Sequence, residues 1–527
     1  MIRRLALLGG VLLALAAVAA FAVSTKPASR ATVSAGQAAE VTSVTRSCPP
    51  PAPGAGTADI AMIAVPSQAA SSSPAGPAKT AGGVPAGSAT VSSVPAALGP
   101  PVANPAKGKP TAGGTPTPGS KTSTSNTSTS KNASTAKSTP AAPVTVAVPG
   151  EASAVPAPGG GDGAGTSVSA TGQMAEGFEA EQADSTGMGL VSCSHPSSDM
   201  WFVGSGEPDV WLYLTNSGTA QASVDVTILT DTGQQSGLAD AITVAPNQVI
   251  AENVSPYVHG AQAIALHVQT STGQIAASVW EGTGAGKGAW LPQSAAPSTT
   301  VVIPGLTVAS SSARLFVTVP GAADAQLKVV AYTPAGAHAQ FDSTTTPVQA
   351  SAAATTPVTL SSLGASAAGL ELTSNVPIVA GVLVPGAGIG SFTAGAAPVT
   401  EQGVVAGNPA TRGLTVGLLL TAPAGAATAS VSVITSDGTV TSPATLQNVT
   451  VGAGHTLAVA VPRPSGRQSF AIVLTPSSHS GPLYAARVVT SGTGGLSAEV
   501  TSLLPVQSAL TEISLPPVQN SYTAVLP

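Results

Sequence analysis

The sequence predicts an all-β protein of tandem immunoglobulin-like or fibronectin-like antiparallel β-sandwich repeats, with an N-terminal hydrophobic helix and a disordered linker. The first observation is a repeat, because the segment 211–233 (WLYLTNSGTAQASVDVTILTDTG) returns as 314–336, 103 residues later, and more loosely as 414–438. The second is the alternation of apolar and polar residues, as in 224–228 (VDVTI), which is the period of a half-buried strand. The third is composition, because 58 Gly and 46 Pro residues disfavour long helices.

The repeats are long enough to form complete sandwiches. Each holds about seven short strands in roughly 100 residues, as an immunoglobulin-like sandwich does. A period of 103 residues is too long for a propeller blade or a solenoid repeat, so we expect separate sandwiches arranged like beads on a string. We place the three repeats at residues 201–306, 307–408 and 409–527, the last with an added C-terminal strand.

The N-terminus is predicted to direct export. Two arginines precede an uncharged run of mostly Leu, Ala and Val from residue 5 to 23. This run is long enough to anchor the chain in a bilayer, and residues 20–22 (AFA) also match a signal-peptide cleavage site, so both alternatives stay open. Residues 1–25 are therefore a signal peptide or a membrane anchor, followed by a spacer at 26–40. In either case the positive-inside rule places the rest of the chain outside the cytoplasm.

A low-complexity segment follows. Residues 67–142 consist mostly of Pro, Ala, Gly, Ser and Thr and show no apolar periodicity. A segment of this kind buries too little apolar surface to fold, so we expect a disordered linker. It interrupts a small N-terminal β-unit at 41–66 and 143–200, which is a candidate fourth repeat.

The two cysteines, Cys48 and Cys193, fall within this N-terminal unit. In an exported chain, an even number of cysteines is most simply explained by a disulfide. The alternative is a redox or metal pair, which the absence of a C-x-x-C spacing disfavours. We therefore predict a Cys48–Cys193 disulfide that closes the unit.

Charge content limits the classes of partner. Only 8% of residues are charged, the 18 Lys and Arg residues are scattered, and the net charge is -5. No basic face is available to neutralise phosphates, so nucleic acid is not an expected partner.

A search for catalytic motifs assigns no catalytic, cofactor-binding or metal-binding residue. The segment 282–288 (GTGAGKG) resembles a phosphate loop but lacks the Ser or Thr that meets magnesium, and we interpret it as a hairpin turn. The six histidines are dispersed without metal-ligand spacing. Asp199, Glu207 and Asp209 lie around Trp201 in the sequence, and two of them could serve as the carboxylate pair of a glycosidase, although a solvated loop is the favoured interpretation.

All four tryptophans, at positions 201, 211, 280 and 290, fall in or just before the first repeat. Strand parity places Trp211 and Trp280 away from the core of their own repeat, so we expect both to be partly exposed. Exposed indoles suit sugars or protein partners, which makes Trp211, Trp280 and Trp201 a candidate ligand surface. The alternative is that these rings fill the junction between the N-terminal unit and the first repeat.

Three motifs carry a resemblance to a known family: SCPPP at Cys48, DMWFVGSG at 199–206 and WLYLTN at 211–216. On these motifs the chain is similar to an uncharacterised actinobacterial family, the domain of unknown function 5719. The resemblance covers most of the chain outside the linker. It implies an extracytoplasmic envelope protein, non-catalytic or uncharacterised, and no functional residues, because the family has no established activity.

The sequence thus favours a non-catalytic extracytoplasmic protein of the cell envelope, secreted or anchored to the cytoplasmic membrane by its N-terminal segment. We expect it to act as a spacer or binding scaffold without a cofactor, with cell-wall glycan or an envelope protein as partner. The first alternative is a glycan-binding module that uses the aromatic residues of the first repeat. The second, less favoured, is a carbohydrate-active enzyme.

Overall fold

The fold is known from a computed structural model that describes residues 37–515 with internal gaps. The gaps are 67–85, 98–141, 147, 159–162, 185–188, 237, 239–240, 284–286, 308–312, 341–347, 361–362, 364–366, 387 and 466–468. The described residues form β-strands, turns and single-turn 3₁₀ helices, so the all-β prediction is confirmed. Within these residues, no helix has the length and apolar character needed to cross a bilayer. The helix predicted within residues 1–25 lies outside them.

The strands form four pairs of antiparallel sheets, which we name the N-terminal sheet pair and sheet pairs 1, 2 and 3. The N-terminal pair consists of sheets β2-β7-β4-β5 and β6-β3-β8-β9. Its strands are β2 (Ser43–Cys48), β3 (Ala58–Ile63), β4 (Ala89–Val94), β5 (Val144–Val146), β6 (Ser153–Pro156), β7 (Gly165–Thr171), β8 (Glu179–Asp184) and β9 (Leu190–Ser192), with a 3₁₀ turn at Gly172–Met174.

Sheet pair 1 consists of sheet β13-β12-β16-β10-β19, with β14 also beside β12, and sheet β15-β11-β17-β18. Its strands are β10 (Asp199–Gly204), β11 (Asp209–Asn216), β12 (Ala222–Thr230), β13 (Gly233–Gln235), β14 (Ile242–Val244), β15 (Gln248–Asn253), β16 (Ile264–Thr272), β17 (Ala276–Gly282), β18 (Gly288–Leu291) and β19 (Gln293–Ser294), with a 3₁₀ turn at Ser255–Tyr257.

In sheet pair 2 both layers share one long strand, β26, whose first half pairs with β20 and β22 and whose second half pairs with β21 and β27. The strands are β20 (Ser298–Thr307), β21 (Arg314–Val319), β22 (Ala325–Thr333), β23 (Gly336–Ala339), β24 (Val348–Ala350), β25 (Ala354–Thr359), β26 (Ala367–Val384) and β27 (Ser391–Ala394).

Sheet pair 3 consists of sheet β28-β34-β30-β31, with β32 also beside β30, and sheet β33-β29-β35-β36. Its strands are β28 (Gly403–Asn408), β29 (Leu414–Ala422), β30 (Ala427–Ile434), β31 (Val440–Thr441), β32 (Val449–Val451), β33 (His455–Ala460), β34 (Phe470–Pro476), β35 (Tyr484–Ser491) and β36 (Glu499–Pro505), with 3₁₀ turns at Ala444–Leu446 and Gly495–Ser497.

The same strand order recurs in all four pairs. In sheet pair 1 the chain alternates between layers, with β10, β12 and β16 in one sheet and β11, β15 and β17 in the other. The N-terminal pair follows the same order, with β2, β4 and β7 in one sheet and β3, β6 and β8 in the other. The N-terminal unit therefore has the strand order of the three repeats that the sequence reveals.

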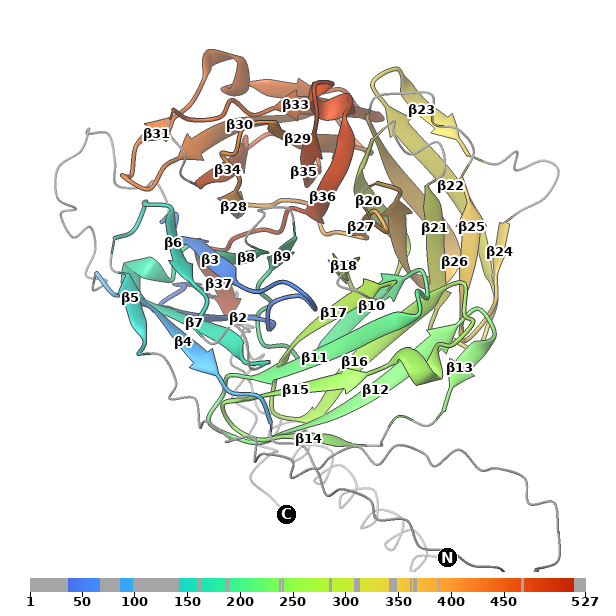
Figure 1. Cartoon of the computed structure of the whole chain (residues 1–527). Coiled ribbons are helices and arrows are strands. Elements are labelled where there is room, and N and C mark those ends of the chain that lie inside the picture. The colour runs from blue at the N-terminus through green and yellow to red at the C-terminus, as the bar shows by residue number, and fades with distance from the viewer. Residues whose placement is uncertain are drawn as a thin grey trace, which may run out of the picture. The chain divides into compact units, whose positions relative to one another are not determined.

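Residues Val41–Thr511 form one compact unit, in which the four sheet pairs follow one another around a common centre (Figure 1). Hydrogen bonds join neighbouring pairs and also join sheet pair 3 to the N-terminal pair. They run from Ala97 N to Val249 O (2.7 Å), from Thr355 Oγ1 to Leu229 O (2.9 Å) and from Gln402 Nε2 to Val65 O (2.7 Å). The expectation of separate beads is therefore wrong, because the last sheet pair packs against the first.

The apolar cores explain this closure. The core cluster of sheet pair 1 includes Phe316, Val379 and Leu383 of sheet pair 2. The cluster of sheet pair 2 in turn includes Leu419 and Ala486 of sheet pair 3. Apolar side chains of one sheet pair thus pack into the core of its neighbour, which holds adjacent pairs together.

Part of the predicted linker is a strand. Strand β4 lies within the segment 67–142 and pairs with β5 and β7, which lie after it. The prediction of a disordered linker is therefore wrong for residues 86–97. Ala89, Val91 and Val94 of this strand are buried. Its short apolar side chains give little hydrophobic signal in a low-complexity sequence. Residues 67–85 and 98–141 lie outside the described residues.

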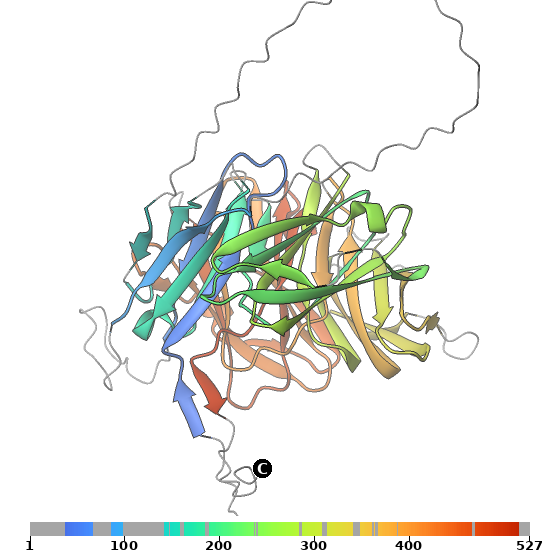
Figure 2. The same cartoon turned by 90° about the horizontal axis from the view of Figure 1, so that it is seen from below.

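The C-terminal strand has a different partner from the predicted one. Strand β37 (Glu512–Leu515) pairs with β1 (Gln37–Glu40) rather than with sheet pair 3, and the two lie side by side, red and blue, in Figure 2. The predicted spacer at 26–40 thus ends in a strand. The repeat boundaries predicted at 306 and 408 fall at the ends of β20 and β28. Strand β20 pairs within sheet pair 2 and strand β28 within sheet pair 3, so each of these sheet pairs begins before the predicted boundary.

Glycines mark the places where sheet pairs approach most closely. A Cβ atom at Gly381 would lie 3.1 Å from Val203 O and 3.2 Å from Val203 Cβ, across the junction of sheet pairs 1 and 2. A Cβ atom at Gly407 would lie 3.0 Å from Ala61 Cβ, across the junction of sheet pair 3 and the N-terminal pair. Larger side chains at these positions would push the sheets apart.

We therefore predict that Gly381→Val destabilises the protein by about 1–3 kcal/mol, the usual cost of overpacking a well-packed core. Urea denaturation followed by far-ultraviolet circular dichroism measures this change. Gly321→Ala is the matched control, because a Cβ atom there meets nothing within 4 Å. Equal stability of the Gly381→Val variant and the wild type would contradict the close packing of the two sheets.

Candidate functional site

A cavity of about 400 Å³ lies where the four sheet pairs meet. All four pairs contribute to its wall: residues 52–56 and 189–190 from the N-terminal pair, 287–290 from pair 1, 388–392 from pair 2 and 501–504 from pair 3. In Figure 1 the corresponding strands β9, β18, β27 and β36 surround the centre of the ring. The volume lies within the range of about 300–1,000 Å³ that is usual for small-molecule sites.

The aromatic part of this wall consists of Trp280, Trp290 and Phe392. Trp211, Trp280 and Trp290 occupy directly opposite positions on the adjacent strands β11, β17 and β18, so they share one face of the sheet. The rings of Trp280 and Trp290 meet edge to face, with centroids 5.3 Å apart. Both line the cavity, whereas Trp211 does not.

The hairpin between β17 and β18 holds Trp280 in place. Gly282 pairs with Gly288, and Thr283 N donates to Lys287 O (2.9 Å), so the two ends of the predicted hairpin turn are paired, while residues 284–286 lie outside the described residues. A Cβ atom at Gly288 would lie only 2.5 Å from Cζ2 of Trp280. The glycine that stands where a phosphate loop has Ser or Thr is thus needed to accommodate the indole.

The predicted exposure of Trp280 is wrong, since only 4% of its surface is accessible. Strand parity placed its side chain correctly on the face away from the core of its own pair. That face is covered by Val191 of the N-terminal pair, which clusters with Tyr213, Trp280 and Trp290. Trp211 is half-buried, and its Nε1 donates to Asp209 Oδ1 (2.8 Å).

Trp201 lies elsewhere. It is 4% exposed and belongs to the core shared by sheet pairs 1 and 2. Its ring stacks on His267 with centroids 3.8 Å apart and an interplanar angle of 11°. His267 Nε2 lies 3.2 Å from Asp199 Oδ1. The structure therefore does not bring Trp201 together with Trp211 and Trp280 in one ligand surface.

The indole N–H groups of Trp280 and Trp290 have no hydrogen-bond partner among the residues that the structure describes, and neither nitrogen is among the fully buried unpaired atoms. Tryptophan N–H groups usually find a partner when buried, so these two donors suit an acceptor on a ligand.

The candidate glycosidase carboxylates have separate partners. Asp209 accepts from Trp211 and Asp199 contacts His267. The backbone N–H of Glu207 donates to Glu281 Oε1 (2.6 Å), and this hydrogen bond positions Glu207. This arrangement does not favour a pair of carboxylates acting on one glycosidic bond.

Glu281 is a residue that sequence reasoning missed. Its side chain is fully buried and also accepts from Ser205 N (3.0 Å) and Ser205 Oγ (2.7 Å), which fixes the turn after β10. Burial raises the pKa of Glu281, and the three donated hydrogen bonds partly offset this effect. A Cβ atom at Gly204 would collide with the Glu281 carboxylate, which explains the first glycine of the motif at 199–206.

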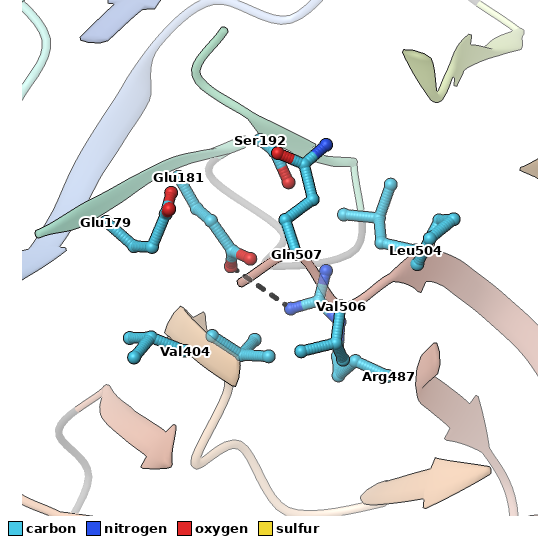
Figure 3. Close-up of a pocket in the computed structure, with 10 residues that line it drawn as sticks. Glu179, Glu181, Ser192, Val404, Arg487, Leu504, Val506 and Gln507 are labelled. Atoms are coloured by element: carbon cyan, nitrogen blue, oxygen red, sulfur yellow. Dashed lines mark hydrogen bonds and ion pairs between the residues drawn. The ribbon is translucent and has the colours of Figure 1, made fainter. Parts of the chain in front are cut away.

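A second buried carboxylate closes the ring. Glu181 of β8 faces Arg487 of β35, with Arg487 Nη1 3.3 Å from Glu181 Oε2 (Figure 3). Gly407 N donates to the same carboxylate oxygen (3.0 Å), and Arg487 Nη1 donates to Gly407 O (2.8 Å). The side chain of Arg487 is fully buried. We name Glu181 and Arg487 the seam pair, because they join the first and last sheet pairs.

The seam pair has little room around it. The space beside it measures about 10 Å³, which is space for one water molecule at most. Burial raises the pKa of Glu181, and Arg487 and the Gly407 N–H oppose this shift. Burial likewise lowers the pKa of Arg487. Because a guanidinium keeps its proton in proteins and the geometry pairs the two groups, we assign the ionised state to both.

The predicted disulfide between Cys48 and Cys193 is present. Both cysteines are buried, and Cys193 borders a void of about 30 Å³ beneath Leu291. Within the described residues, no group of three or more His, Cys, Asp or Glu side chains is placed to hold a metal ion.

The chain matches the model of a protein family described as Family of unknown function (DUF5719), over residues 144–462. The match covers more than half of the 527 residues. No curated protein matches the chain. The actinobacterial source of the family stays a prediction.

We predict that Arg487→Met destabilises the protein by about 3–5 kcal/mol, because it leaves Glu181 buried without its cation. The double variant Glu181→Gln/Arg487→Met is expected to lose less stability than the sum of the two single variants. Urea denaturation of all four proteins measures the coupling. Arg314→Met is the control, because Arg314 is exposed and makes two long hydrogen bonds of 3.4 and 3.5 Å and a cation–π contact with Phe316 but no ion pair among the described residues. Additive losses would contradict a coupled pair.

A pH-dependent contribution is expected from His267. Burial lowers its pKa, with Asp199 acting in the opposite sense. The native state therefore binds a proton less readily than the unfolded state, so this contribution to stability is present above the ordinary pKa of about 6.5 and is lost as pH falls from there through the lowered native pKa. Between pH 7.5 and 5, wild type should lose more unfolding free energy than His267→Asn. Equal losses in both proteins would refute this.

Proposed function

The chain belongs to this family of unknown function, DUF5719, and we propose that it is a non-catalytic extracytoplasmic envelope protein that holds a saccharide in its central cavity. One observation carries the proposal: Trp280 and Trp290 line a cavity of about 400 Å³ to which all four sheet pairs contribute. The sequence offers a binding scaffold and a glycan-binding module as alternatives. In this proposal the scaffold binds the glycan itself, so the two are one function.

The wall chemistry supports a saccharide. An indole offers an apolar face for the C–H groups of a sugar ring and an N–H donor for a hydroxyl oxygen. Ser391, Thr501 and Ser502 add small polar groups to the same wall. A Cβ atom at Gly56 or Gly388 would meet no protein atom within 4 Å, so bare backbone is available there for close approach by a ligand.

Export is supported by the disulfide. Structural disulfides persist in oxidising compartments, and Cys48–Cys193 joins the two parts of the N-terminal sheet pair that the low-complexity segment separates. In this proposal the N-terminal segment is removed as a signal peptide or anchors the protein in the cytoplasmic membrane.

The pairing of two antiparallel sheets in each repeat supports the immunoglobulin-like or fibronectin-like assignment, which stays part of the proposal.

The competing functions have less support. A spacer without a ligand does not account for a cavity of about 400 Å³ to which all four sheet pairs contribute. A docking site for an envelope protein would be expected to use an exposed surface, and the cavity is recessed among four sheet pairs. The carbohydrate-active enzyme is disfavoured because Asp199, Glu207 and Asp209 are placed by three different contacts.

We predict that soluble cell-wall saccharides bind to the full chain and shift its tryptophan emission. Trp290→Leu removes one indole from the cavity wall and should weaken binding at least tenfold, as loss of an aromatic anchor does. Isothermal titration calorimetry gives the affinity, and circular dichroism verifies the fold of each variant. Trp211→Phe is the matched control, because Trp211 lies in the same row but not at the cavity.

The outcomes separate the alternatives. Binding that Trp290→Leu abolishes and Trp211→Phe retains would support the cavity as the site. If no saccharide of a panel of neutral and acidic wall fragments binds, the proposed function fails. Binding that is indifferent to Trp290 would place the site elsewhere and overturn the role of the cavity.

A further inference from the structure

The cavity carries two charged side chains among its described lining residues, Asp184 and Lys287. They differ in their surroundings. Asp184 ends strand β8, its carboxylate lies against Gly189, and it already has an interaction partner. Lys287 is exposed and makes no side-chain hydrogen bond or ion pair with any residue that the structure describes.

The backbone of Lys287 is fixed while its ammonium group is free. Lys287 O accepts from Thr283 N (2.9 Å), and the next residue, Gly288, pairs with Gly282. Lys287 thus stands directly before the glycine on which the Trp280 indole rests. Its four-carbon stem gives the ammonium group reach across the cavity mouth beside that indole.

The position of this charge is specific. The chain has only 18 Lys and Arg residues and a net charge of -5, so Lys287 is not part of a generally basic surface. A turn of small residues does not need a lysine for its conformation. A free cation next to an aromatic platform is suited to a ligand that combines an apolar ring face with an anionic group.

We propose that Lys287 makes the cavity selective for acidic saccharides, in which a carboxylate or phosphate on the sugar meets the Lys287 ammonium while the sugar contacts the small parts of Trp280 and Trp290 that line the cavity. This inference rests on the proposed function and deepens it by naming the ligand class. Lys287 contributes attraction and orientation, and the indoles contribute the contact that any saccharide makes.

Matched probes test the proposal on the full chain. N,N′-diacetylchitobiose and the disaccharide of N-acetylglucosamine and N-acetylmuramic acid differ in the lactyl carboxylate. N-acetylglucosamine and its 6-phosphate supply the corresponding pair for phosphate. Titration calorimetry at low and high salt should show the acidic member of at least one pair binding roughly five- to tenfold more tightly at low salt, the scale of a partly exposed ion pair. The pair that shows the preference identifies the anionic group.

Lys287→Gln should remove this preference without changing the affinity for the neutral probes. Lys328→Gln is the control, because Lys328 is an exposed lysine of β22 that does not line the cavity, and it changes the net charge equally. Equal binding of neutral and acidic probes by wild type, or a preference that survives in Lys287→Gln, would overturn the inference and leave the proposed function intact. Failure of all four probes and of the wider panel would overturn both.

Discussion

The structure depends on one constraint, the burial of the apolar faces at which neighbouring sheet pairs meet. An isolated sandwich buries one face of each sheet and exposes the other, but all seven residues of β17 and all six of β28 are buried. A linear row of sandwiches would leave an apolar face uncovered at each end. Packing the last sheet pair on the first covers both of these end faces, while strands such as β15 and β22 keep a row of exposed residues. The same constraint is consistent with a chain that is 8% charged and 43% hydrophobic.

Because the last sheet pair packs on the first, a few charged side chains are buried where the two meet. The seam pair is buried, and its Coulomb attraction has to offset the desolvation of two charges, so its value lies in the fixed geometry that it imposes. Glu181 stands opposite Ser192 of β9, and Arg487 stands opposite Leu504 of β36. Both of these inner strands contribute to the cavity wall, through Leu190 and Leu504. The seam pair therefore ties two sides of the candidate binding site together, although neither charge lines the cavity.

Much of the local structure follows from the sequence. The period of 103 residues, the alternation in 224–228 and the turn residues predict strands and sheet class, because side-chain direction in a strand is set by position alone. The disulfide follows from an even number of cysteines in an exported chain, and the hairpin at 282–288 follows from its glycines. Strand parity also put Trp211 and Trp280 on one face, and Trp290 joins them there because β18 pairs with β17.

Only the tertiary structure decides what covers the sheet face that carries these three tryptophans. Parity identifies the residues that share a face, but it does not say whether water or another sheet lies against them, so the exposure predicted for Trp280 was wrong. Glu181 and Arg487 are 306 residues apart, and no local pattern marks either of them as buried. Strand β4 was missed because its partners β5 and β7 lie far along the chain. The sequence by itself determined the strands, their repetition and the disulfide, which depend on local periodicity and residue chemistry. Ring closure, the seam pair and the aromatic cavity arise from contacts between distant segments, so only the tertiary structure decided them.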